Sequence, residues 1–507
     1  MTASLTVTCP ADGRVVGSIV DMDSAAVRQR LARLREAQVG WEKIGPRARA
    51  RWLSRWREWL LDHQQSLADV LQSETAKPRA EAGLEPLLAA DMINYFAGHA
   101  VEFLRDGARR PHGPLGLTKR LMTVYRPYPV VGVITPWNFP LAMPVMDAAP
   151  ALVAGAAVAL KPSEVTPLSA LELQRGWAEI GAPAVFDVLT GGSNAGAAVV
   201  DHADFIQFTG ATRTGRVIAA RAASRLIPYS LELGGKDPAI VLADADIDRA
   251  VEGVMWGGLF NAGQVCVSIE RVYVEAPIYN EFVTRLAERM RELRQGPDDR
   301  DCRFDIGPLA TPAQRDIVAH HVADAIERGA TAAVGGAPGV SGTFFEPTVL
   351  VDVDHSMACM REETFGPTIP VMKVGDADEA IHLANQSNYG LSATIWTANV
   401  ARGVELARRL EAGAVNVNDA MSNLFNFTLP HSGWKESGVG ARFGGADGVR
   451  KYTRQQAITV PRVQVAEREL LWYPYTAERH KLAVRILRLI TGRGVARILP
   501  ARRRPRG

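Results

Sequence analysis

A glutamate and a cysteine, each beside glycines, are the residues of this chain best suited to covalent catalysis. Glu232 lies in the run Leu-Glu-Leu-Gly-Gly-Lys-Asp-Pro, and Cys266 ends the run Asn-Ala-Gly-Gln-Val-Cys, 34 residues later. A thiolate can attack an electrophilic carbon, and a carboxylate can then activate water to release the product. A lone cysteine is more often a small buried hydrophobe and a lone glutamate a surface charge, so each residue by itself indicates little.

A further glycine-containing segment is suited to binding phosphate. Gly210-Ala-Thr-Arg-Thr-Gly215 follows a predicted strand at residues 205–208 and opens a predicted helix. The N-terminus of a helix presents free backbone N–H groups and the positive end of its dipole to an anion. The two glycines are five residues apart, so this is not the common G-x-G-x-x-G fingerprint.

Alternating strands and helices are expected to position these segments. Apolar runs at residues 130–134 and 156–160 are typical of buried strands. Further strands are expected at residues 185–189, 205–208, 239–242, 271–275, 345–350, 368–373, 393–396 and 414–418, and helices at 143–153, 167–180, 279–295 and 312–329. This alternation predicts an α/β protein with parallel, doubly wound sheets. Residues 130–160 are long enough to span a bilayer, but four prolines interrupt them, which favours a buried core segment.

The N-terminal region is predicted to form a hairpin followed by helices. Residues 7–20 read as a hairpin with a turn at Asp12-Gly13. Apolar residues at helical spacing predict helices from residue 23, over 47–71 and over 80–104. Residues 121–126 alternate as a strand does, and the surrounding segment is predicted to be an extended hairpin.

These motifs resemble those of the aldehyde dehydrogenase superfamily over nearly the whole chain. The E-L-G-G-K and N-x-G-Q-x-C segments of that family match those at Glu232 and Cys266, and its E-E-I-F-G-P segment matches residues 362–367. The resemblance implies an α/β fold with two doubly wound parallel-sheet domains, for cofactor and catalysis, plus a small β oligomerisation arm. The implied boundaries are 1–107 and 128–234 for the NAD-binding domain, 235–436 for the catalytic domain, 108–127 and 450–462 for the arm, and 463–507 for a basic C-terminal extension.

By this resemblance, Cys266 attacks an aldehyde carbonyl to form a thiohemiacetal. The Asn138 side-chain amide and the Cys266 backbone N–H would hold the oxyanion, since donors fixed in advance stabilise a developing charge. Hydride transfer to a nicotinamide leaves a thioester, which Glu232 hydrolyses by activating water. Relatives that transfer the acyl group to coenzyme A typically lack this carboxylate, so Glu232 favours a free acid as the product.

The resemblance also implies a set of cofactor-binding residues. They are Ile134, Thr135, Pro136, Trp137, Lys161, Ser163, Glu164, Gly210, Ala211, Thr214, Gly215, Leu233, Gly234, Glu363 and Phe365. A carboxylate at Glu164 would accept hydrogen bonds from the ribose hydroxyls and repel a 2′-phosphate, which favours NAD, with NADP still possible beside Lys161. The chain departs from the family pattern at Ala211, Ser432, Arg442 and Asp147.

Composition excludes several other classes of protein. The chain has 507 residues, enough for two or three domains, and a net charge of +3, which gives no nucleic-acid footprint. Its four cysteines are widely separated, so neither a disulfide framework nor a zinc site is expected. The N-terminus has no basic and apolar signal pattern, and we expect a cytoplasmic protein without a metal.

The resemblance implies an aldehyde as the substrate, and the sequence indicates which aldehyde only by likeness. Residues 261–274 look most like bacterial succinate-semialdehyde dehydrogenase-type members, which makes succinate semialdehyde the first expectation, with a medium-chain or aromatic aldehyde left open. The alternatives in other classes are a catalytically silent binding or structural member and an enzyme that acylates coenzyme A.

The C-terminal extension differs in composition from the rest of the chain. Residues 479–499 mix leucine, isoleucine and valine with arginines, and Arg502-Arg503-Arg504 follow. A basic amphipathic segment can lie on an anionic membrane surface, so a weak membrane contact is one hypothesis. The other hypotheses for this segment are a solvated tail and a helix packed on a neighbouring subunit. Separately, the family resemblance implies a homodimer or homotetramer.

Overall fold

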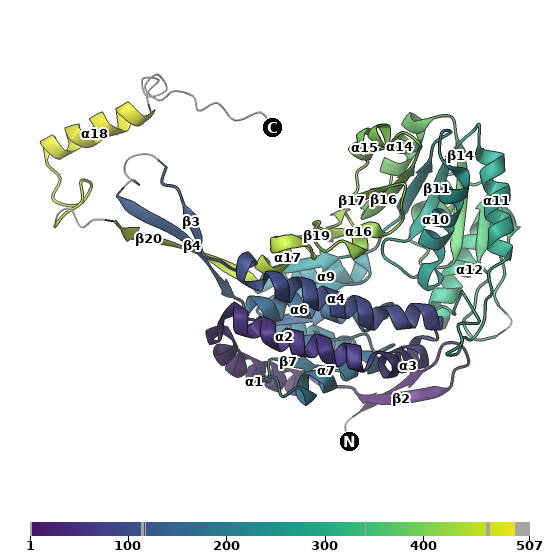
Figure 1. Ribbon diagram of the computed structural model, residues 1–507, viewed down its shortest axis with the longest axis horizontal. Helices are drawn as coiled ribbons and strands as arrows, with labels where there is room; N and C mark the ends of the chain where they lie inside the picture. Colours follow the sequence, from purple (N-terminus) through teal and green to yellow (C-terminus); the bar gives the residue numbers. More distant parts are fainter. Residues whose placement is uncertain (1–2, 113–115, 117, 340, 463–466, 492–507) are drawn as a thin grey trace. The chain divides into compact units, whose positions relative to one another are not determined.

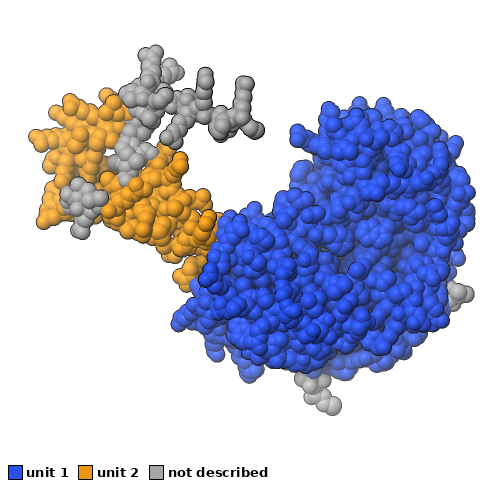
Figure 2. Space-filling view, in the orientation of Figure 1, with its two compact units in different colours: residues 1–103, 127–453 blue, residues 104–126, 454–507 orange. Residues whose placement is uncertain are grey.

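The computed structural model describes residues 3–112, 116, 118–339, 341–462 and 467–491. Its chain divides into two compact units (Figure 2). The larger comprises Met1–Phe103 and Pro127–Thr453, and the smaller comprises Leu104–Arg126 and Arg454–Gly507. All the candidate site residues belong to the larger unit.

The larger unit contains a six-stranded sheet with the strand order β19-β9-β8-β5-β6-β7, parallel except for β19. Its strands are β5 (Val130–Ile134), β6 (Ala157–Lys161), β7 (Phe186–Val188), β8 (Phe205–Thr209), β9 (Tyr229–Glu232) and β19 (Gly438–Val439). Strands β5, β6 and β8 are buried along their whole length, as in a parallel sheet covered on both faces. Gly132 allows a close approach in β5, because a Cβ there would lie 2.6 Å from a Val199 methyl group.

Helices of the N-terminal half surround this sheet (Figure 1). They are α1 (Ser24–Lys43), α2 (Gly45–Asp62), α3 (Gln64–Thr75), α4 (Arg79–Phe103), α6 (Ala142–Ala154), α7 (Leu168–Glu179), α8 (Ser193–His202) and α9 (Thr212–Ser224). Asp23 caps α1 by accepting a hydrogen bond from the Ala26 N–H at 2.8 Å. The prediction of a single helix over residues 47–71 is wrong. The backbone of His63 is not helical, and this residue separates α2 from α3.

A second sheet has seven strands in the order β12-β13-β14-β11-β10-β16-β17, with only β12 antiparallel to its neighbour. Its strands are β10 (Asp237–Val241), β11 (Ile269–Glu275), β12 (Thr331–Val334), β13 (Thr348–Val351), β14 (Thr368–Val374), β16 (Ser392–Trp396) and β17 (Ala414–Val417). Ile240 belongs to one buried cluster, whereas Ala239 and Val241 belong to another, as alternation along a strand requires.

Helices alternate with the strands of this second sheet. They are α10 (Ile247–Leu259), α11 (Tyr279–Arg291), α12 (Pro312–Glu327), α13 (Ala358–Arg361), α14 (Ala377–Asn385) and α15 (Val400–Ala407), with the 3-10 turn η1 (Phe260–Gly263) and α16 (Ser422–Phe425). Helix α17 (Gly445–Arg450) packs instead against α4 and α6. Two-stranded sheets pair β1 (Ser4–Thr8) with β2 (Val15–Val20) and β15 (Tyr389–Gly390) with β18 (Trp434–Lys435). The hairpin predicted near the N-terminus is therefore present and begins three residues earlier than expected.

The smaller unit contains an antiparallel sheet in the order β20-β4-β3 and one helix. These are β3 (Gly107–Arg109), β4 (Lys119–Pro127), β20 (Thr453–Pro461) and α18 (Ala477–Thr491). No helix in the described ranges is both long and apolar enough to cross a membrane. Residues 463–466 and 492–507, with the Arg-rich end of the predicted extension, lie outside the described residues.

Candidate active site

The candidate site lies at the carboxyl edge of the six-stranded sheet, where its winding reverses. From β5 the chain builds β6 and β7 on one side, and it then returns to add β8 and β9 on the other. Crevices outside the carboxyl ends of strands at such a reversal are where open α/β sheets bind ligands. The loop at residues 135–140 follows β5, and residues 210–215 follow β8, so both predicted cofactor segments border this crevice.

Glu232 and Cys266 come from neighbouring segments that pack against each other. Glu232 is the last residue of β9, and the glycine turn after it leads into β10. A Cβ at Gly235 would lie 2.8 Å from the carbonyl oxygen of Cys266, so only glycine permits this approach. The carboxylate and thiol that the sequence places 34 residues apart therefore belong to one site.

The backbone before Cys266 has an unusual conformation that side chains hold in place. Asn261 and Ala262 both have left-handed backbones, with φ of 54° and 56°. The Asn261 N–H donates to Glu81 Oε1 at 3.0 Å, and its side-chain Nδ2 donates to the Asn138 carbonyl oxygen, also at 3.0 Å. Gln264 Nε2 donates back to the Asn261 carbonyl at 3.0 Å, which closes the turn that presents Cys266.

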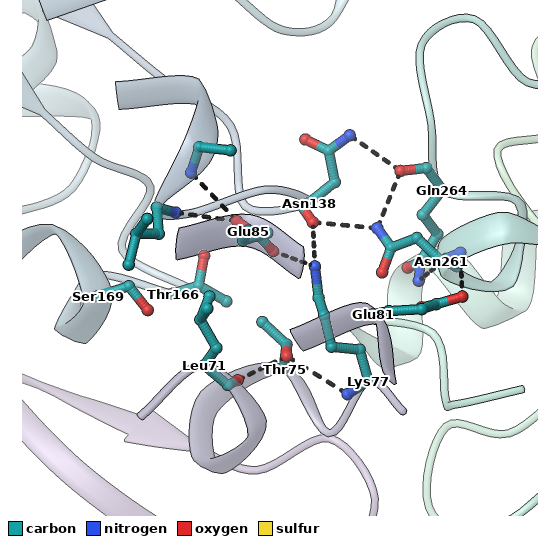
Figure 3. A network of polar contacts seen from close by, with 12 residues as sticks. Leu71, Thr75, Lys77, Glu81, Glu85, Asn138, Thr166, Ser169, Asn261 and Gln264 are labelled. Atoms are coloured by element: carbon teal, nitrogen blue, oxygen red, sulfur yellow. Dashed lines mark hydrogen bonds and ion pairs between the residues drawn. The ribbon is translucent and has the colours of Figure 1, made fainter. Parts of the chain in front are cut away.

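A hydrogen-bonded network joins this turn to the loop that carries Asn138 (Figure 3). Asn138 Nδ2 donates to the Gln264 carbonyl at 2.9 Å. Lys77 Nζ donates to the Asn138 carbonyl at 2.9 Å and pairs with Glu85. Both ions are buried, so their mutual pairing avoids an isolated charge in the core. The network fixes Asn138 beside the Cys266 turn.

A cavity of about 270 Å³ has Cys266 in its wall. Of the predicted residues, it is lined by Pro136, Trp137, Asn138, Gly210, Ala211, Leu233, Gly234, Cys266, Glu363 and Phe365, and it is also lined by Met143, Thr209, Gln314 and Ile317. The rings of Trp137 and Phe365 meet edge to face at 5.5 Å, and Gln314 Nε2 donates to the Thr364 carbonyl at 2.8 Å. The predicted catalytic residues Cys266 and Asn138 thus line the same cavity as eight of the predicted cofactor-binding residues.

The other predicted cofactor residues lie outside the lining of this cavity. They are Ile134, Thr135, Lys161, Ser163, Glu164, Thr214 and Gly215. Lys161 Nζ pairs with Glu164 at 2.9 Å, and the Glu164 side chain is 47% exposed. Burial is the largest single influence and raises the pKa of Glu164. The charge and hydrogen bond of Lys161 oppose it, and the net pKa of Glu164 is lowered.

Glu232 is fully buried in a cluster of ionisable side chains. Its Oε1 lies 3.6 Å from Arg442 Nη1 and 3.5 Å from His431 Nε2. Arg442 Nη2 lies 3.7 Å from Asp147 Oδ2. Neither carboxyl oxygen of Glu232 has a hydrogen-bond partner among the described residues. Arg442 and His431 therefore flank the Glu232 side chain, and both of its oxygens are available to a hydrogen-bond donor.

Burial is the largest single influence on the pKa values of the Cys266 thiol, Asp147 and Lys451. It raises the pKa of the Cys266 thiol, Glu232 raises it further, and Arg442 lowers it. Burial also raises the pKa of Asp147 against the charge of Arg442, and it lowers the pKa of Lys451 to about 7. Arg442 is therefore the cation that favours the thiolate form of Cys266.

Comparison with known proteins decides the family. The sequence matches the model of the aldehyde dehydrogenase family over residues 1–458. The chain belongs to the aldehyde dehydrogenase family. It is 39% identical over 453 residues to a Mycobacterium tuberculosis protein provisionally named succinate-semialdehyde dehydrogenase (NADP+) 2, covering 88% of this chain and 86% of that protein. It is 37% identical over 478 residues to the 4,4'-diapolycopene aldehyde oxidase of a Methylomonas species, covering 93% of this chain and 88% of that protein.

A solved aldehyde dehydrogenase has the same fold as this chain. The betaine aldehyde dehydrogenase of Staphylococcus aureus, solved with NAD+, superposes with a TM-score of 0.86 at 29% identity, covering 93% of this chain and 96% of that one. The α/β aldehyde dehydrogenase fold expected from the sequence is confirmed.

The cavity wall fits the nicotinamide cofactors used by aldehyde dehydrogenases. The N-terminus of α9 has no side-chain cap and borders the cavity at Gly210 and Ala211, as a phosphate site requires. Thr209 Oγ1 lines the cavity, is buried and has no hydrogen-bond partner among the described residues. A Cβ at Gly234 would lie 2.6 Å from Glu363 Oε1, so a larger residue there would displace the Glu363 side chain.

Several residues of this aldehyde dehydrogenase site were not assigned from the sequence. Lys77 and Glu85 carry the network under Asn138, and Glu270 accepts hydrogen bonds from the Thr364 and Phe365 N–H groups at 2.8 and 2.7 Å. Its position beside Pro86 inside a helix was a usable signal for Glu85. Lys77 had no such signal, because its role depends on contacts with distant parts of the chain.

Proposed function

We propose that this protein oxidises an aldehyde to a carboxylic acid with a nicotinamide cofactor, using Cys266 as the nucleophile. The observation that carries the proposal is the joint placement of Cys266 and Asn138 on one cavity wall, with the buried Glu232 next to Cys266. In this scheme the Cys266 thiolate adds to the aldehyde carbon. The Asn138 amide and the Cys266 N–H then hold the resulting oxyanion.

The cofactor would be held by α9 at Gly210 and Ala211, by Glu363 and Phe365, and by Lys161 and Glu164. Held there, a nicotinamide cofactor would supply the hydride acceptor that oxidation of an aldehyde requires. Glu232 takes a proton from water, which attacks the thioester and releases the acid from Cys266. Its buried carboxyl oxygens accept no hydrogen bond from the described residues, which suits a general base.

The experiment is the appearance of NADH absorbance with a panel of aldehydes (acetaldehyde, hexanal, benzaldehyde and succinate semialdehyde), with NAD or NADP. A signal that requires no coenzyme A supports hydrolysis. A signal only with coenzyme A would replace the hydrolytic scheme by an acylating one. Folded protein that binds NAD but oxidises none of the aldehydes would support the silent-member alternative.

Arg442 is proposed as a positioning residue that sets the ionisation of Cys266. The thiolate is the reactive form, and its pKa is raised, so the rate of the first turnover is expected to rise with pH. Replacing Arg442 by Met removes the charge that lowers this pKa. The rise should then move to higher pH by about one unit. Rapid-mixing measurement of the NADH burst across pH checks this.

Arg442→Lys is the matched control, because it keeps the charge and should keep most of the wild-type pH dependence of the NADH burst. The double variant Asp147→Asn with Arg442→Met avoids leaving Asp147 without a cation, should the single variant unfold. A burst whose pH midpoint is unchanged in Arg442→Met would contradict this role.

NAD is proposed as the preferred cofactor because the Glu164 carboxylate would repel a 2′-phosphate. We expect kcat/KM for NAD to exceed that for NADP by about tenfold or more, a difference typical of one nearby charge. Glu164→Gln should raise kcat/KM for NADP and lower it for NAD. Glu172→Gln, on α7 and paired with Arg175, is the control that should change neither. A wild-type preference for NADP would refute the assignment.

The smaller unit is proposed to join subunits into a homodimer or homotetramer through its three-stranded sheet. Several apolar side chains of this unit are exposed, including Leu471, Trp472 and Leu482. Burial of such side chains by a second copy would be favourable. Light scattering of the full chain measures the assembly, and vesicle co-sedimentation tests the weaker hypothesis of membrane contact. The cytoplasm remains the expected compartment.

A further inference from the structure

A second cavity, also of about 270 Å³, adjoins the one that contains Cys266. Met143 lines both cavities. Phe139, beside Asn138 in the chain, and Phe260, beside Asn261, stack at 5.9 Å in the wall of the second cavity. Its other lining residues are Glu81, Leu84, Glu85, Leu87, Leu88, Asp91, Ala142, Met146, Leu424 and Phe425. This second cavity, the tail cavity, therefore begins next to the reacting group.

The wall of the tail cavity is mostly apolar from its depth to its mouth. Met143 and Met146 are 3% exposed, whereas Leu84 is 52% exposed. The lining residues come from helices α4, α6 and α16 and from Phe260. Leucine, methionine and phenylalanine side chains offer adaptable apolar contacts and no fixed hydrogen bonds. Such a wall suits a hydrocarbon chain or ring.

The charged groups of the tail cavity are acidic. Within the described ranges, neither lysine nor arginine lines it, and its ionisable residues are Glu81, Glu85 and Asp91. Burial raises the pKa of Glu81 to about 7. A substrate carboxylate in this cavity would meet apolar groups and other carboxyl groups, with no cation in the wall to compensate its lost hydration.

Two cations in contact with residues of the cavity wall, Lys77 and Arg442, are already engaged. Lys77 Nζ lies 4.6 Å from the centre of the Phe139 ring, but it pairs with Glu85 and donates to the Asn138 carbonyl. Arg442 is 2% exposed and lies between Glu232 and Asp147. Its Nη2 is 2.7 Å from the Met143 sulfur, so Met143 stands between Arg442 and the tail cavity.

We infer that the tail cavity selects aldehydes with an uncharged, apolar tail and disfavours those with a terminal carboxylate. The inference rests on the proposed aldehyde oxidation at Cys266 and names the substrate class of that site. The provisional name of the mycobacterial relative specifies an anionic aldehyde, succinate semialdehyde. The lining of this chain's cavity favours a different class.

The test compares aldehydes that differ only in the terminal group. Butanal should exceed succinate semialdehyde in kcat/KM, and hexanal should exceed 6-oxohexanoate, each by on the order of 100-fold. Among unbranched alkanals, kcat/KM should rise about fourfold per added methylene until the tail cavity is filled. Equal or better use of the two anionic aldehydes would overturn the inference while leaving aldehyde oxidation intact.

Variants at the mouth and in the wall separate this inference from the proposed chemistry. Leu84→Arg adds a cation at an exposed position and should raise kcat/KM for 6-oxohexanoate about tenfold, whereas Leu84→Gln should not. Leu88→Trp should lower kcat/KM for decanal by a much larger factor than kcat/KM for acetaldehyde. An equal loss for both aldehydes would contradict the tail cavity as the binding site. No turnover of any aldehyde, acetaldehyde included, would overturn both the proposed function and the inference.

Discussion

Cys266→Ala is expected to abolish aldehyde oxidation, with kcat reduced by on the order of 10⁴-fold or more. The thiol is the group on the cavity wall that can form a covalent bond to the aldehyde carbon, and alanine leaves the turn without a nucleophile. Because the Asn261 and Gln264 hydrogen bonds that shape the turn do not involve the thiol, the fold should survive. The measurement is NADH production with acetaldehyde and hexanal.

Cys359→Ala is the matched control for this substitution. Cys359 is also buried, and burial likewise raises the pKa of its thiol, to about 11, but it lies in the apolar core of the second sheet. Its replacement should leave kcat within about twofold, since such a change only removes a small hydrophobe. NAD binding, followed by quenching of tryptophan fluorescence, should persist in both variants. Normal turnover by Cys266→Ala would refute covalent catalysis at this residue.

The fold could be predicted because its strands carry strong local signals. The apolar run at Val130–Ile134 matches β5 at both ends, and the run at residues 156–160 matches β6 within one residue. A strand buried on both faces has no polar positions, so the run itself gives its length. The break at His63 was not predictable in this way, because the apolar spacing continues from α2 into α3.

The candidate site was predictable where its residues lie in one motif and not where the fold brings distant residues together. Cys266, Asn138 and Glu363 were assigned from local segments, and all three line one cavity. The sequence showed that Arg442 departs from the family pattern. The position of Arg442 between Glu232 and Asp147 was not predictable, because these residues lie in three separate parts of the chain.

The apolar character of the tail cavity was hidden for a different reason. Helix α4 has buried residues along its whole length, and its leucines 84, 87 and 88 look like ordinary core or surface positions. Only the three-dimensional structure shows that they line one cavity together with Phe139 and Phe260. The likeness of residues 261–274 to succinate-semialdehyde dehydrogenases concerns the nucleophile segment, which does not include the opposite wall.

Glu232→Gln is expected to stop the reaction at the acyl-enzyme, in which the acyl group is bound to Cys266 as a thioester. Glutamine keeps the size of the side chain but cannot accept a proton from water, so hydrolysis should slow by about 10³-fold. The first hydride transfer needs no base at this position. It should proceed, and it should become faster at a given pH, because Glu232 raises the pKa of the Cys266 thiol. A burst of about one NADH per subunit followed by a slow phase is the expected trace.

Mass spectrometry of the stalled protein should find the acyl group on the peptide that contains Cys266. Glu74→Gln is the matched control, because Glu74 is a buried glutamate whose pKa burial raises to about 7, and it accepts hydrogen bonds from the Leu168 and Ser169 N–H groups away from the cavity. It should alter stability and leave the burst and the slow phase as in the wild type. Unimpaired steady-state turnover in Glu232→Gln would show that another group activates water. Loss of the burst itself would instead place Glu232 in the formation of the thioester, where its carboxylate would take the proton from the Cys266 thiol.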